Sequence, residues 1–94
     1  MIDIDDKLQD AQEMAMKFPA TFDAPSVIDI ADAIPGSFVK VSASGERFWV
    51  RVTKNDVTHI EGTVNNDLIR THTHGLKDGD AVRFSTNRIY STME

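Results

Sequence analysis

The stretch Arg47-Phe48-Trp49-Val50-Arg51-Val52 decides the fold of this chain. Its residues alternate in character with a period of two, which predicts a β-strand with two different faces. Phe48, Val50 and Val52 share one face, which is typical of the side that packs on a core. The opposite face places Trp49, the only tryptophan, between two arginines. Such a tryptophan predicts a cover from elsewhere in the chain or from a partner.

Further alternating stretches, separated by turn residues, extend this pattern through the rest of the chain. The expected strands are 38–43, 46–53, 57–64, 68–73 and 81–85. The inward positions predict a core of Val41, Phe48, Val50, Ile60, Val64, Val82 and Phe84. Short strands at intervals of about 8–12 residues are typical of a small barrel. We expect a five-stranded, mostly antiparallel SH3-like β-barrel, with an oligonucleotide-binding barrel as the alternative.

Residues 1–37 are expected to form an acidic helical arm and linker that packs on the barrel formed by residues 38–94. Good helix formers between Asp5 and Lys17 predict a helix that Pro19 ends. Its apolar stripe would contain Ile4, Leu8, Ala11, Ala15 and Phe18. Ser26 is a candidate N-cap, with Asp29 three residues later, for a second short helix over 27–33. The two parts together predict one α+β domain.

Composition limits the cellular setting and the partners. The net charge is −5, and no cysteine is present, which excludes disulfides and thiolate metal sites. Residues 1–37 carry two basic and eight acidic residues (−6), whereas residues 38–94 carry eight basic and seven acidic residues (+1). The acidic start differs from a secretory signal, and no apolar run is long enough to span a membrane. We expect a cytoplasmic protein with no membrane partner.

Several motifs together resemble a YegJ-like family of small bacterial domains of unknown function. They are Phe48-Trp49-Val50-x-Val52, Gly62-Thr63-Val64-Asn65-Asn66, and Gly75-Leu76-x-x-Gly79-Asp80-x-Val82-x-Phe84 with Ile89. The likeness spans about residues 18–89. The resemblance implies a β-rich fold and no activity or catalytic residues. Relatives often have a proline soon after the asparagine turn, whereas this chain has Leu68 and Ile69 there.

No catalytic signature stands out in the chain. His72-Thr73-His74, with His59 as a third ligand, is the best metal candidate, but chance explains such spacing equally well. A Gly-x-Ser-x-Gly motif and a phosphate-binding glycine loop are absent. We therefore expect no enzyme activity, no cofactor and no metal.

The strongest candidate for a binding site is the face that carries the tryptophan. Its predicted residues are Phe38, Lys40, Arg47, Trp49 and Arg51. Three interpretations are open: the N-terminal helix covers this face, a protein partner binds it, or bases of single-stranded nucleic acid stack on it. The expected function is non-catalytic protein binding, with an acidic inhibitor or regulator as one form of it. A single-stranded nucleic-acid-binding barrel is the alternative, and homo-oligomers are also compatible with the pattern.

Overall fold

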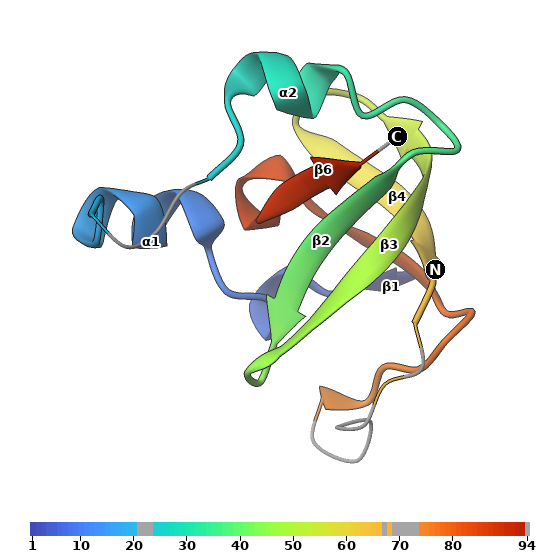
Figure 1. Cartoon of the computed structure of the whole chain (residues 1–94). Helices are drawn as coiled ribbons and strands as arrows, with labels where there is room; N and C mark the ends of the chain where they lie inside the picture. Colours follow the sequence, from blue (N-terminus) through green and yellow to red (C-terminus); the bar gives the residue numbers. More distant parts are fainter. Residues whose placement is uncertain (21–23, 67, 69–73, 94) are drawn as a thin grey trace.

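A computed structural model describes residues 1–20, 24–66, 68 and 74–93 (Figure 1). Its strands are β1 (Ile2–Asp3), β2 (Phe38–Ala43), β3 (Glu46–Asn55), β4 (His59–Val64), β5 (Ala81–Ser85) and β6 (Ser91–Met93). They form one mixed sheet in the order β1-β5-β4-β3-β2-β6. The helices are α1 (Ala11–Lys17) and α2 (Val27–Ala31), with 3-10 turns η1 (Asp5–Lys7) and η2 (Thr86–Arg88). The predicted α+β class is confirmed.

The prediction of five strands is wrong, because the sheet has six described strands. Four predicted strands correspond to β2, β3, β4 and β5. The predicted strand 68–73 lies outside the described residues apart from Leu68. β1 and β6 were missed because two or three residues are too few to show a periodicity. Closure into a barrel is not confirmed either, since β1 and β6 end the sheet and do not pair with each other.

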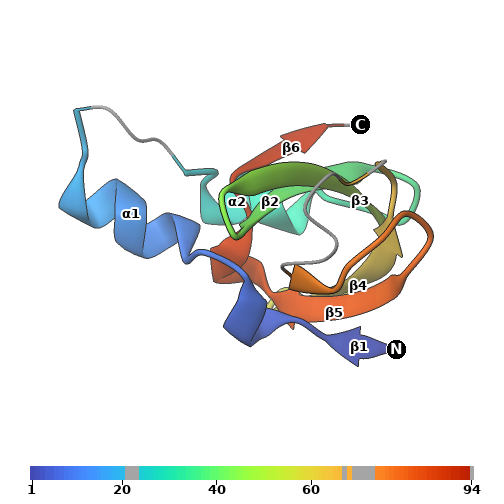
Figure 2. The same ribbon diagram turned by 90° about the horizontal axis from the view of Figure 1, so that it is seen from below.

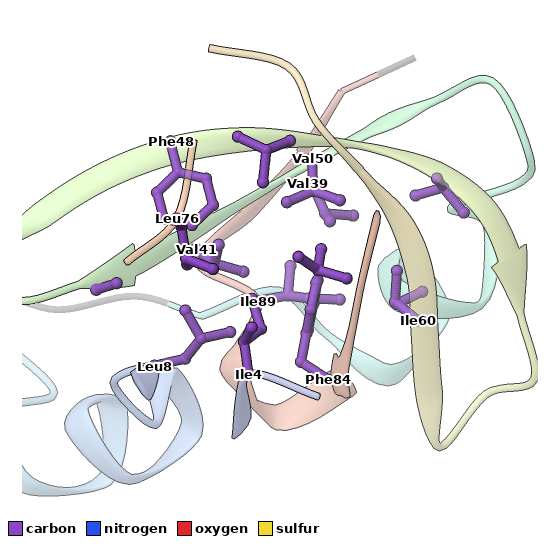
Figure 3. Close-up of a cluster of buried hydrophobic side chains, with 14 of the residues drawn as sticks. Ile4, Leu8, Val39, Val41, Phe48, Val50, Ile60, Leu76, Phe84 and Ile89 are labelled. Atoms are coloured by element: carbon purple, nitrogen blue, oxygen red, sulfur yellow. The ribbon is translucent and has the colours of Figure 1, made fainter. Parts of the chain in front are cut away.

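The sheet curls around one hydrophobic core. All seven predicted core residues are buried, with exposed fractions of 2% or less. In Figure 3 the labelled side chains of β2 and β3 point inward, toward the labelled side chains of Ile4 and Phe84. Figure 2 shows β2 and β3 on one side of this core and β4 and β5 on the other. The alternation that identifies β3 therefore also assigns its faces correctly.

The helix predicted over residues 5–17 is interrupted at residues 8–10. Leu8 forms an isolated bridge with Ala43 of β2, and the Gln9 N–H donates to the Ser42 carbonyl at 2.9 Å. The Asp10 side chain then accepts the Glu13 N–H at 2.9 Å and begins α1. A continuous helix would lose these bonds to the sheet, so tertiary contacts outweigh the local helix propensity.

The N-terminal segment connects β5, near one edge of the sheet, with β2, near the other edge. β1 pairs in parallel with β5, and the Ile4 N–H donates to the Arg83 carbonyl at 2.9 Å. Five residues later, the chain is bonded to β2, which is next to the last strand on the other side of the sheet. Ile4 and Leu8 are buried, whereas Phe18, in the same predicted stripe, is 51% exposed. Only the first half of the stripe therefore packs on the core.

Helix α2 begins as predicted and ends two residues early. Ser26 and Asp29 form both bonds of a capping box. The Asn55 amide donates to the carbonyls of Ile30 and Ala33 at 2.8 and 3.1 Å. These bonds tie the end of α2 to the end of β3 and stop the helix at Ala31.

Gly62 lies where two neighbouring strands approach closely. A Cβ atom at this position would lie 2.3 Å from the Arg51 carbonyl oxygen and 2.6 Å from Val50 Cγ1. On the opposite strand, the β3–β4 register shifts between Val52 and Lys54. Only glycine fits here without movement of the backbone.

We expect Gly62→Ala to lower the free energy of unfolding by about 1–3 kcal/mol, because the added methyl group overpacks the β3–β4 contact. Urea unfolding monitored by circular dichroism measures this loss. Thr63→Ala is the matched control, since Thr63 lies on the outer side of the same strand, and it should cost less than about 1 kcal/mol. Equal losses in the two variants would contradict the close approach.

Candidate interaction face of the sheet

All five predicted binding residues lie on the outer face, which we define as the side of β2 and β3 turned away from the core, and four of them pair directly across the two strands. Phe38 lies directly opposite Arg51, and Lys40 lies directly opposite Trp49. Residues paired in this way share one face of an antiparallel sheet. The Lys40 Nζ atom lies 4.7 Å from the centre of the Trp49 ring, in a cation–π contact. The outer face thus combines aromatic rings with positive charge.

The asparagine turn after β4 fixes the backbone of Trp49. The Trp49 N–H donates to the Asn66 side-chain oxygen at 2.7 Å, and the Asn65 N–H donates to the Trp49 carbonyl at 2.9 Å. The side chain of Trp49 itself is half-buried. A ring held on a bonded strand loses little conformational freedom on binding, which suits an anchor residue. Sequence reasoning identified Asn65 and Asn66 only as turn residues and missed this role.

Arg47, the fifth predicted residue, also lies on the outer side of β3 but contacts a different ring. Its guanidinium lies 4.8 Å from the centre of the Tyr90 ring. The Tyr90 hydroxyl donates to the Gln9 side chain. Burial raises the pKa of Tyr90, while Arg47 and a hydrogen bond with Ser42 act in the opposite direction. Arg47 therefore helps to hold the segment before β6 on the sheet.

The N-terminal helix does not cover the outer face, contrary to one of the sequence interpretations. Ile4 and Leu8, which were expected to lie over Phe38 and Trp49, are part of the core on the other side of the sheet. Helix α1 packs against η2 and projects to one side of the sheet (Figure 2). Asp3 of the arm lies 3.9 Å from Arg83, and Asp5 lies 3.7 Å from Arg88. Neither arginine belongs to the outer face.

The cations of the outer face have no acidic partner within the described part of the chain. No described ion pair involves Lys40, Arg47 or Arg51. By contrast, neighbouring cations are matched: Lys54 lies 4.0 Å from Glu61, and Arg83 lies 3.9 Å from Asp3. The outer face of β2 and β3 therefore presents positive charge on an acidic chain.

Asp5, Ser85 and His59 come together on β5 and its neighbours, but their bonds serve the fold. Asp5 accepts the Ser85 N–H at 2.6 Å and also the Ser85 hydroxyl. His59 lies opposite Ser85 in the register, yet its Nδ1 bonds to the Thr58 hydroxyl at 3.1 Å. The serine hydroxyl thus donates to a carboxylate and has no bond to an imidazole base, which a serine nucleophile needs.

The pKa of Asp5 reflects this position. Burial alone would raise it, but the hydrogen bonds from the Ser85 side chain and backbone, together with the Arg88 guanidinium, lower the pKa below its ordinary value of 3.8. The Arg88 Nε atom lies 3.7 Å from the carboxylate. These interactions attach the N-terminal segment to β5 and η2.

His74 is a buried structural residue. Its Nε2 lies 2.9 Å from Glu46 Oε1, and its Nδ1 accepts the Leu76 N–H at 3.0 Å. Both ring nitrogens are therefore engaged within the protein, which leaves neither for a metal ion. His72 and Thr73 lie outside the described residues, and His59, the third candidate ligand, bonds through Nδ1 to the Thr58 hydroxyl. Within the described residues, no three His, Cys, Asp or Glu side chains are grouped for metal binding.

Comparisons with protein-family models, with curated proteins and with solved structures give no match to this chain. Among the described residues, no helix has the length and apolar character needed to cross a membrane. The functional argument therefore rests on the geometry of the chain itself.

We expect Asp5→Asn to lower the free energy of unfolding at neutral pH by about 1–3 kcal/mol, because hydrogen bonds to a charged acceptor are weakened. The folded-state pKa of Asp5 is lowered. Its stabilising effect is therefore present above the ordinary carboxyl pKa and is lost as the pH falls through the folded-state value. Urea unfolding at neutral pH and at about pH 3 should show a difference between variant and wild type that shrinks on acidification.

Asp6→Asn is the control for this measurement, since Asp6 lies exposed in the same 3-10 turn. It should leave the unfolding free energy within about 0.5 kcal/mol of wild type. A difference for Asp5→Asn that is the same at both pH values would show that the charge of Asp5 does not stabilise the fold.

Proposed function

We propose that this chain is a non-catalytic protein-binding module whose outer face is the binding surface. The observation that carries this proposal is Trp49, half-buried on an outer sheet face and flanked by Lys40 and Arg51. The arm that was the strongest candidate to cover this ring is used in the core instead. Tryptophan and arginine are the residues most enriched at the energetic centres of protein interfaces.

The chemistry of the outer face selects an acidic partner surface with an apolar centre. Lys40 and Arg51 would meet carboxylates, while the exposed part of Trp49 and Phe38 would meet an apolar side chain. Met93 of β6 lies opposite Phe38 in the register and is 50% exposed, so it extends the apolar area. An acidic inhibitor or regulator is one form of this function, motivated by the net charge of −5.

Single-stranded nucleic acid is the second candidate ligand for the outer face, because it also carries negative charge and stacks on aromatic rings. Two observations favour a protein. Lys40 already lies over the Trp49 ring, so a base would have to displace it before stacking. The chain as a whole is acidic, which opposes long-range attraction of a polyanion.

The absence of catalysis is part of the proposal. Among the described side chains that resemble catalytic groups, Ser85 and His74 are engaged in bonds that hold distant segments together, and the His59 ring bonds to the adjacent Thr58 hydroxyl. The proposal also includes a cytoplasmic location, which the lack of cysteine supports.

We also propose that the fold is an open SH3-like barrel. Its support is the order of the elements: β2 to β5 form an antiparallel meander, η2 follows, and β6 returns to pair with β2. Membership in the YegJ-like family is likewise a proposal. It is supported by the positions of the motif residues, since Phe48, Val82 and Phe84 fill the core and Gly62 lies at the close approach.

The test is the effect of Trp49→Ala on partner capture. The immobilised full chain should retain a specific partner from a bacterial lysate, and mass spectrometry would identify it. We expect Trp49→Ala to weaken binding of the purified partner at least about ten-fold, measured by titration calorimetry, because ring anchors dominate interface energy. The unfolding free energy should change by less than about 2 kcal/mol, since the ring is only half-buried.

Met16→Ala is the matched control, because Met16 is 83% exposed on α1, away from the outer face. It should bind the partner as wild type does. Loss of binding in both variants, or in neither, would contradict the assignment of the outer face. Tight binding of an oligothymidine, with a salt dependence that Arg51→Ala reduces, would favour the nucleic-acid candidate instead.

A further inference from the structure

A groove runs along the free side of β6, on a different part of the surface from Trp49. Two adjoining hollows of about 150 and 420 Å³ form it, and both are lined by Asp29 and Thr92. Their other lining residues are Ala24, Pro25, Asp32, Ala33, Ser37, Tyr90, Ser91 and Met93. One wall is thus α2 with the segment before it, and the other is β6. We call this hollow the β6 groove.

The β6 strand offers an unpaired backbone edge to this groove. β6 is the last strand of the sheet, and its only partner is β2. In an antiparallel pair, alternate residues turn their N–H and C=O groups away from the partner strand. Within the described residues, no backbone hydrogen bond reaches that side of residues 91–93. Such an edge is a template for one more strand.

The charge of the β6 groove is negative. Asp29 and Asp32 line it and are exposed, while none of the described lysines or arginines does so. One Asp29 oxygen accepts the Ser26 N–H at 3.3 Å, and the other is not used in that bond. Within the described residues, the Asp32 carboxylate accepts no hydrogen bond and forms no ion pair. An occupant of the groove therefore meets two carboxylates beside an unpaired strand edge.

We propose that the β6 groove binds an extended, Lys- or Arg-containing peptide segment of a partner protein, which adds to the sheet as a strand beside β6. Backbone bonds to the strand edge would supply affinity, and the two carboxylates would select a basic sequence. A second copy of this chain is a poorer occupant. Pairing two β6 strands would bring Asp29 and Asp32 of one copy toward those of the other, on chains of net charge −5.

This inference goes beyond the proposed function, because it uses a different surface and the opposite charge. The two surfaces adjoin at one point, where Met93 lines the β6 groove and also lies opposite Phe38. Trp49 does not line the groove. Trp49→Ala should therefore leave peptide binding at β6 unchanged, so the failure of one proposal is distinguishable from the failure of the other.

The test is a titration of the isotope-labelled full chain with an eight-residue peptide of alternating lysine and valine, followed by NMR. We expect the largest amide shift changes at residues 91–93 and 29–33. An alternating glutamate–valine peptide is the control for charge, and it should cause no saturable change. Binding of the two peptides with equal affinity would overturn the role of Asp29 and Asp32.

Backbone methylation of the peptide tests strand addition directly. N-methyl groups on all valines, or on all lysines, block the N–H groups on one side of an extended chain. One of these two peptides should lose binding, and the other should retain it, since only one side can face β6. Equal affinity of both methylated peptides with the unmodified one would exclude pairing with the strand edge.

Asp32→Asn tests the acidic wall without removing the α2 cap. We expect it to raise the Kd about two- to five-fold, as for the loss of one exposed ion pair. Asp78→Asn is the control with the same change in net charge, since Asp78 is exposed and does not line the groove. It should change the Kd by less than about two-fold at physiological salt.

Two further results would overturn the proposal. The first is the absence of any shift change at millimolar peptide. The second is a concentration-dependent molar mass of the chain alone in light scattering, with shift changes at residues 91–93 on dilution. That second result would identify another copy of the chain as the occupant.

Discussion

A curled sheet that does not close leaves its core open on one side, and this gap is the constraint on which the rest of the structure depends. The N-terminal segment fills it. Ile4 and Leu8 are buried in the core. Backbone hydrogen bonds join the segment to Arg83 of β5 and to Ser42 of β2, near opposite edges of the sheet. Buried apolar side chains and satisfied backbone groups are thus supplied together. The arm is consequently part of the domain and not an accessory to it.

This use of the arm determines what the outer face can do. The side chains that complete the core cannot also cover Trp49, because the two sides of a β-sheet are separate surfaces. Asp5 of the segment is committed as well, since it bonds to Ser85 and lies close to Arg88. The positive charge on the outer face of β2 and β3 therefore stays available to a partner.

The sequence predicted those features that follow from a long alternating pattern. β3 has ten residues, so its inward set of Phe48, Val50 and Val52 could be read without tertiary information. Once β2 and β3 are paired, Lys40 and Trp49 are expected on the same face, because alternate residues of a strand share a face. Ser26 was also predicted as the N-cap of α2, because this signal is local. Asp29, expected to be a poor substitute for the usual glutamate, nevertheless completes the capping box.

Features that depend on distant contacts could not be predicted. The helix expected through Leu8 is interrupted because that residue bridges to Ala43, 35 positions later in the chain. Arg47 was grouped with Trp49 because the two residues share one face of the strand. The aromatic ring that Arg47 contacts is that of Tyr90, which lies near it because β6 folds back on β2. β1 and β6 carry too few residues for a period, and only the pairing of each with a longer strand defines them.

The net charge of this chain describes its local surfaces poorly. Its total of −5 hides a cationic outer face and an acidic groove that adjoin at Met93. Because charges farther apart than about 8–10 Å are largely screened at physiological salt, a partner responds to the local group and not to the sum. A basic extended segment at β6 and an acidic surface over Trp49 would each meet complementary charge. A single partner with a basic segment and an acidic surface at the matching spacing would engage both sites at once. Its affinity would then exceed that of either site alone.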